Sequence, residues 1–163
     1  MATSRLDDVI NALLSLLRAE TGYRAPSTEG TGVPVFDGPE VAGDRFTEPQ
    51  LIIVGDSPAG GAATFEQVGV TMAATTRPRD ETGTVYVSAI ANDGNTPAEA
   101  RASALALVAT VETLVRTNPD LGLGSGSGFR WVGSPTSVDL TQTAHPNGFT
   151  AQLDFSLTYM ARL

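Results

Sequence analysis

The 163-residue chain contains no cysteine and a single histidine, His145. Without cysteine it can form no disulfide, offers no thiolate ligands to zinc and has no cysteine nucleophile. With one histidine, a transition-metal site would have to be built from carboxylates alone. The sequence therefore predicts no metal site, no cofactor site and no thiol chemistry.

Positive charge is also scarce. Ten basic residues, all arginine, stand against 18 acidic residues, and the formal net charge is −8. The arginines are scattered singly except for Arg77 and Arg79. A protein that grips nucleic acid by its phosphates needs a basic patch, and the sequence shows none. We therefore expect any contact with nucleic acid to be non-adhesive.

Long apolar runs are missing as well. The longest weakly polar stretch, between Arg101 and Glu112, is shorter than the roughly twenty residues of helix that cross a bilayer. Near the N-terminus, Arg5, Asp7 and Asp8 interrupt the apolar positions that a secretion signal would keep continuous. These features predict a soluble, intracellular protein without a membrane segment.

Two helices are expected. The first begins near Thr3 or Ser4, either of which can cap it, and ends by Gly22. The second begins at the capping box TPAE (96–99), with proline at the first helical position, and stops at Asn118. Its buried stripe is expected to comprise Ala100, Ala104, Leu107, Val108, Val111, Leu114 and Val115.

Strands fill most of the remaining chain. They are expected at 33–36, 51–56, 64–76 and 83–91, and then in the segments FRWVG, TSVDLTQT and the C-terminal stretch. A loop-rich segment at 23–48 and a flexible glycine–serine linker at 122–128 separate these elements. The order predicts a single α+β domain, 1–163, with two helices packed on a mostly antiparallel mixed sheet.

The C-terminal segment GFTAQLDFSLTYMARL (148–163) alternates apolar and polar residues without interruption. This period predicts a long strand with one buried and one wet face. A strand of this length is a liability unless both edges are paired or covered. We expect it either at the centre of the sheet or completed across a subunit interface, where the candidate inter-subunit residues are Phe149, Leu153, Phe155, Leu157, Tyr159 and Arg162.

The charged segment RPRDET (77–82) is expected to form the tip of a β-hairpin. Its charged side chains would then be solvated or would meet an acidic partner. The candidate partner-contact residues are Arg77, Arg79, Asp80 and Glu81.

One arrangement resembles an enzyme. The segment LIIVGDS ends at Ser57, and Asn92, Asp139 and His145 follow in the order of the serine esterases of the GDSL type. On that resemblance Ser57 would be the nucleophile, His145 its base and Asn92 an oxyanion donor. However, those hydrolases have parallel doubly wound sheets, whereas this region predicts a hairpin without a helix. The esterase remains a distant alternative, and no catalytic residue is expected.

The order of elements over nearly the whole chain resembles the tail terminator proteins of long-tailed phages, also called tail completion or head–tail joining proteins. The matching features are a short leucine-rich first helix, VPVFDGPE (33–40), a strand ending LIIVGD, the helix within RASALALVATVETLVRTNPDLG (101–122), and an alternating last strand ending in aromatic-x-Ala-Arg-Leu. Other neck or head-completion proteins of phages are similar in size and fold, and a generic binding module that dimerises through an edge strand is a further alternative.

This resemblance implies a structural virion protein without catalysis or cofactor. Such proteins form a ring, expected to be a homohexamer, on the head-proximal end of the tail tube. The ring stops tube polymerisation and joins the neck connector of the head, while DNA passes through its lumen without specific binding. The expected partners are further copies of the chain, the tube protein and the connector. The expected location is the virion tail, after assembly in the host cytoplasm.

Overall fold

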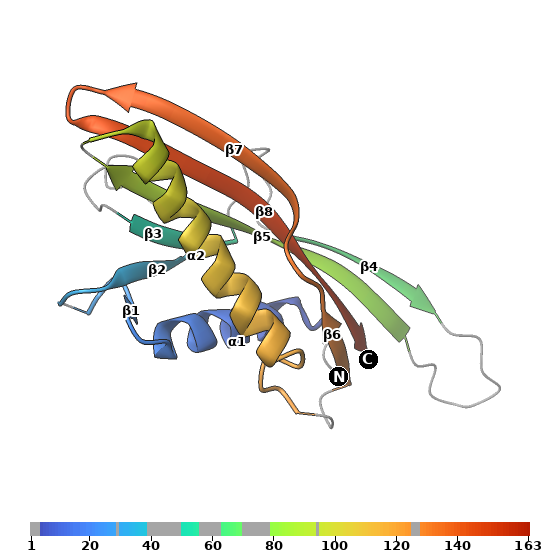
Figure 1. Ribbon diagram of the computed structural model, residues 1–163. Helices are drawn as coiled ribbons and strands as arrows, with labels where there is room; N and C mark the ends of the chain where they lie inside the picture. The colour runs from blue at the N-terminus through green and yellow to red at the C-terminus, as the bar shows by residue number, and fades with distance from the viewer. Residues whose placement is uncertain are drawn as a thin grey trace.

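The computed structural model describes residues 4–28, 30–38, 50–55, 63–69, 79–93, 95–124 and 128–163, with backbone alone for 50–53 and 130–132. Two helices pack against a strongly twisted sheet, which confirms the expected α+β class (Figure 1). The elements are α1 (Leu6–Ala19), β1 (Tyr23–Arg24), β2 (Val33–Asp37), β3 (Gln50–Val54), β4 (Ala63–Gly69), β5 (Arg79–Asp93), α2 (Pro97–Thr117), β6 (Phe129–Val132), β7 (Thr136–His145) and β8 (Gly148–Arg162).

The sheet is mostly antiparallel with a small parallel part, as the sequence predicts. Strands follow the order β1-β2-β3-β5-β8-β6, while β4 pairs with β5 and β7 pairs with β8. The two parallel contacts join β1 to β2 and β2 to β3. The β4–β5 hairpin extends beyond both helices (Figure 1), and its connecting segment, 70–78, lies outside the described residues.

The strand β8 lies at the centre of the sheet. One edge pairs with β5 from Phe149 to Arg162, and the other pairs first with β7 and then with β6. Of the two expectations for this segment, the central position is therefore the one observed. The edges that would have been a liability are satisfied within the chain.

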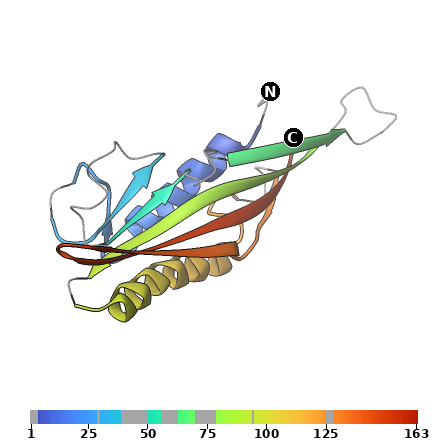
Figure 2. The same cartoon turned by 90° about the horizontal axis from the view of Figure 1, so that it is seen from above.

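Helix α2 matches its sequence signals closely. The Thr96 hydroxyl accepts a hydrogen bond from the Glu99 N–H at 3.2 Å, and Pro97 is the first helical residue. The helix ends before Asn118, and its buried residues are the seven expected from the 3.6-residue period. Figure 2 shows α2 along one face of β7, β8 and β5.

Helix α1 begins at Leu6, and its N-cap is Arg5 rather than Thr3 or Ser4 as expected. The Ser4 hydroxyl accepts from the Leu6 N–H at 3.0 Å, so Ser4 still satisfies one of the free N–H groups at this end. Gly22, with φ of +88°, lies in the turn after the helix rather than within its last turn.

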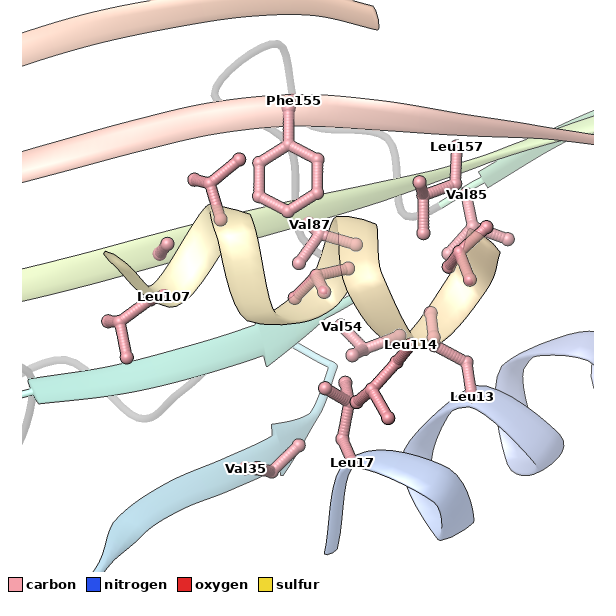
Figure 3. Close-up of a cluster of buried hydrophobic side chains, with 14 of the residues drawn as sticks. Leu13, Leu17, Val35, Val54, Val85, Val87, Leu107, Leu114, Phe155 and Leu157 are labelled. Carbon is pink, nitrogen blue, oxygen red and sulfur yellow. The ribbon is translucent and has the colours of Figure 1, made fainter. Parts of the chain in front are cut away.

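The hydrophobic core lies between the two helices and one face of the sheet. Figure 3 shows Leu114 of α2 close to Leu13 and Leu17 of α1, while Leu107 lies nearer the other end of α2. Alternate residues of the two long strands supply the rest, among them Val85, Val87, Leu153, Phe155 and Leu157. No helix within the described ranges is long and apolar enough to cross a bilayer.

The expected linker at 122–128 is anchored at both described ends. Leu121 is buried, and the Gly128 carbonyl accepts a hydrogen bond from the Arg162 N–H at 2.7 Å. A Cβ at position 128 would collide with the Arg162 carbonyl, so glycine is needed for this close approach. The intervening residues 125–127 lie outside the described part of the chain.

Candidate functional site

The prediction that 77–82 form a hairpin tip is wrong for residues 79–82, because these residues already belong to β5, which begins at Arg79. Asp80 pairs with Arg162 across the sheet, with Asp80 Oδ1 and Arg162 Nε 3.6 Å apart. Glu81 is buried, with 1% of its surface exposed, and therefore is not a surface contact. Arg79 is exposed, and Arg77 lies outside the described residues. The charged composition of the segment suggested a turn, whereas pairing with both β4 and β8 extends the strand through it.

The Glu81 carboxylate joins α1 to three strands. Its Oε1 atom accepts hydrogen bonds from Ser4 Oγ at 3.0 Å, from the Arg5 N–H at 2.9 Å and from the Tyr159 hydroxyl at 2.8 Å. Its Oε2 atom accepts from Gln67 Nε2 at 2.8 Å. A carboxylate at the N-terminus of a helix also interacts favourably with the helix dipole. This cluster fixes the start of α1 to the root of the β4–β5 hairpin.

Burial and hydrogen bonding act in opposite directions on Glu81. Burial alone raises the pKa of the carboxyl, but the hydrogen bonds from Gln67, Arg5, Tyr159 and Ser4 outweigh it and lower the pKa below its ordinary value. Burial, together with the hydrogen bond and the charge of Glu81, raises the pKa of the Tyr159 phenol well above its ordinary value. The pair is therefore an ionised carboxylate and a neutral phenol at neutral pH.

The candidate inter-subunit residues of β8 are used inside the chain, which corrects that expectation. Leu153, Phe155, Leu157 and Tyr159 are buried in the core, and Phe149 packs against it. The ring of Tyr159 stacks on Phe129, with the ring centroids 6.1 Å apart. A residue that serves the core of its own subunit is not available as a contact for the next one.

The sheet face opposite the core carries no helix among the described elements. Alternation places on it hydroxyl and amide residues of β5, β7 and β8 together with the acids Glu66, Asp80, Asp139 and Asp154. Arg162 of β8 also lies there, and it is paired with Asp80. We call this surface the polar face.

The side chains of the polar face are less exposed to solvent than the alternation predicts. Thr150, Asp154 and Ser156 are buried, as is Ser88 on the neighbouring strand. Their polar atoms have hydrogen-bond partners. Ser88 Oγ donates to Asp154, and Gln152 Nε2 donates to both Asp154 oxygens at 2.9 and 3.0 Å. Thr150 Oγ1 donates to Asn92, and Ser156 Oγ donates to the Thr136 carbonyl at 3.3 Å. Buried polar groups on a sheet persist when they are satisfied in this way. The middle of this face thus holds several separate hydrogen-bonded groups and, beside them, the buried Ile90, against which Phe36 packs.

The residues of the esterase-like pattern are not assembled into a described catalytic site. Ser57 lies outside the described residues. Asn92 accepts a hydrogen bond from Thr150 Oγ1 at 2.6 Å within the polar face, and His145 stands at the end of β7, beside the turn to β8. Around them, β3 and β8 each pair with β5 in the antiparallel direction, unlike the neighbouring strands of the parallel sheet in those hydrolases. The described residues also contain no cluster of three or more potential metal ligands.

Sequence reasoning missed the exposed apolar residues at the rims of the sheet. Phe65 and Val68 project from β4, and Val138 and Leu140 project from β7, each about half exposed. Alternation predicts strands but not their order, so only the topology shows that β4 and β7 each pair with a single strand among those described. The sequence did contain one sign of an edge strand without protection: residues 136–145 include no lysine, arginine or proline.

Comparison with protein-family models and with curated proteins finds no match to this chain.

Proposed function

We propose that this protein is a structural subunit of a phage tail, which forms the ring that caps the head-proximal end of the tail tube. In this role it stops tube polymerisation and offers a joining surface to the neck of the head. The proposal starts from the order of elements along the sequence. The observation that carries it in the structure is the chemistry of the polar face.

The polar face has the properties needed to line a channel for DNA. Its hydroxyl and amide groups are neutral, and its exposed acids, Glu66 and Asp139, repel phosphate. A surface that holds DNA would instead need several free arginines or lysines close together. Here Arg162, the arginine that β8 contributes to the polar face, is already paired with Asp80. With the helices on the other face, the polar face can turn towards a lumen while α2 faces outwards.

The experiment is electron microscopy of particles from a phage whose copy of this gene carries an early stop codon. Overlong tails without heads are expected, because nothing would then end the growth of the tube. The wild-type gene supplied in trans is the matched control and is expected to restore tails of normal length with heads attached.

The other outcomes overturn the proposal in distinct ways. Tails of normal length that fail to join heads would make the protein a different neck component. Intact, infectious particles from the stop-codon phage would remove it from tail assembly altogether. In that case Ser57 would be tested for labelling by a fluorophosphonate.

A further inference from the structure

Strand β7 is exposed along nearly its whole length. Its residues 136–144 are all exposed, and among the described strands it pairs with β8 alone. Its hydrogen bonds to α2 within the described ranges involve one side chain, Gln142. The other outer strands, β1, β4 and β6, each hold a residue with further interactions: Arg24, Gln67 and Phe129. No residue of β7 is engaged in this way, so its outer edge is the one considered for a further strand.

The backbone of β7 directs alternate hydrogen-bonding groups away from β8. The Arg162 N–H and the Thr158 carbonyl of β8 bond towards the β6 side, so the even-numbered residues of β8 face β6 and β7. Bonded and non-bonded pairs alternate in an antiparallel ladder. The register of β7 on β8 therefore leaves the backbone groups of the following residues pointing outwards: Leu140, Gln142 and Ala144.

The one acid of β7 lies opposite another acid. Asp139 is exposed and pairs in register with Asp154 of β8. Like charges at directly opposite positions destabilise a sheet. Asp154 accepts hydrogen bonds from Ser88 and Gln152, but neither carboxylate forms an ion pair with the described residues. A basic side chain on a strand next to Asp139 would relieve this repulsion.

The side of β7 that faces α2 offers apolar surface. Leu140 lies on this side, because it pairs with the core residue Leu153, and yet it is 45% exposed. A hydrogen bond from Arg101 to Gln142, at 3.3 Å, places this part of the strand beside α2. Leu105, one helical turn after Arg101, is 50% exposed. Leu140 and Leu105 can therefore contact apolar residues of a strand added to β7.

We propose that the outer edge of β7 binds an extended segment of a partner protein as a further strand. The open backbone groups favour an extended chain, which adds its own N–H and carbonyl groups to the sheet. On one side this segment carries arginine or lysine next to Asp139. On the other side it carries apolar residues against Leu140 and Leu105. The inference goes beyond the proposed function, because it holds for any assembly to which the chain belongs.

A basic partner fits this edge better than a second copy of the chain. The net charge of −8 opposes self-association. In addition β7 contains no arginine or lysine, so pairing of β7 with β7 would leave Asp139 uncompensated in both copies. The charge of the added strand therefore distinguishes the two occupants.

The test follows the exchange of amide protons by NMR, with the free protein and with a synthetic peptide of sequence RVTVRVTVRT. In the free protein the N–H groups of Leu140, Gln142 and Ala144 are expected to exchange faster than those of Thr141 and Thr143, which face β8. A saturating amount of the peptide is expected to slow exchange of the three outward groups at least about tenfold, because each bonded N–H exchanges only after opening.

An acidic peptide, EVTVEVTVET, is the control for charge. It keeps the apolar positions and is expected to bind at least about tenfold more weakly at low ionic strength. Equal protection of the outward amides by the two peptides would overturn the assignment of a basic partner.

Two variants test the edge itself. Ala144→Pro removes an outward N–H that the β7–β8 ladder does not use, and Leu140→Lys places a charge on the edge. Both are expected to lose the protection by the basic peptide. The matched control is Val68→Lys, which adds the same charge at an exposed apolar residue of β4 and is expected to keep it.

Three further results would overturn the inference. They are no protection of the outward amides by the basic peptide, protection that persists in both edge variants, and protection without peptide that grows with protein concentration, which indicates a second copy. The stop-codon phage tests the proposed function separately, so the failure of one proposal leaves the other in place.

Discussion

Removing residues 160–163 is expected to abolish folding of the chain. Although this segment is short, it supports β6 and the start of β5 at once. The Arg162 N–H donates to the Gly128 carbonyl at 2.7 Å, and the Leu163 N–H donates to the Arg79 carbonyl at 2.8 Å. Ala161 is buried in the core. Each lost backbone hydrogen bond costs about 1 kcal/mol, and the exposed core surface around β6 adds to that cost.

The combined loss approaches the whole stability of a typical domain, which is roughly 5–15 kcal/mol. We expect the truncated protein to be recovered only in insoluble form, or to show no cooperative thermal transition by circular dichroism. The control is Met160→Ala, which removes an exposed side chain and keeps the backbone; it is expected to lie within about 0.5 kcal/mol of the wild type. A truncated chain with the wild-type melting temperature would contradict the central role of β8.

Replacing Glu81 by leucine is expected to lower the free energy of unfolding by about 3 kcal/mol. The substitution leaves the Ser4 hydroxyl, the Arg5 N–H, the Gln67 amide and the Tyr159 hydroxyl without their acceptor. Unsatisfied buried donors cost about 1–3 kcal/mol each, partly recovered where water can reach them. For a chain of this size the melting temperature would fall by roughly 6–12 °C.

The control for this change is Glu66→Leu, because Glu66 is an exposed glutamate on β4. It is expected to shift the melting temperature by less than about 2 °C. Equal effects at the two positions would show that the hydrogen bonds to Glu81 do not stabilise the fold.

The Glu81 carboxylate also predicts a pH dependence. Its pKa is lowered in the folded protein, so its contribution is complete above the ordinary glutamate pKa of about 4.3 and is lost as the pH falls below it. Compared with Glu81→Gln, which does not ionise, the wild type is expected to lose its extra stability between about pH 5 and pH 3. A difference in melting temperature that stays constant over this range would contradict ionisation of Glu81 as the cause.

The sequence predicts best where one local rule decides the structure. The buried stripe of α2 follows from a capping box, a 3.6-residue period and a stop at Asn118, all of which act within one helix. The alternation of 148–163 likewise predicts a strand, and its length predicts a place where both edges are satisfied.

Sequence reasoning failed where the outcome depends on partners that are distant along the chain. Glu81 has the same parity as the buried Val85 and Val87, which was a usable signal. Three of its four donors, Ser4, Arg5 and Tyr159, lie 76 to 78 residues away along the chain and follow from no local rule. The positions of β4 and β7 beside a single described partner strand each depend on the order of strands in the sheet. The alternation of side chains cannot predict that order, because it is the same in an edge strand and in a central strand.

The most direct test of the account is cryo-electron microscopy of the head-proximal end of the tail in assembled particles. We expect a ring of copies of this chain there, with the polar face of β5 and β8 towards the channel and α2 on the outside. Absence of the chain from the tail end, or a ring whose channel is lined by α2, would contradict it.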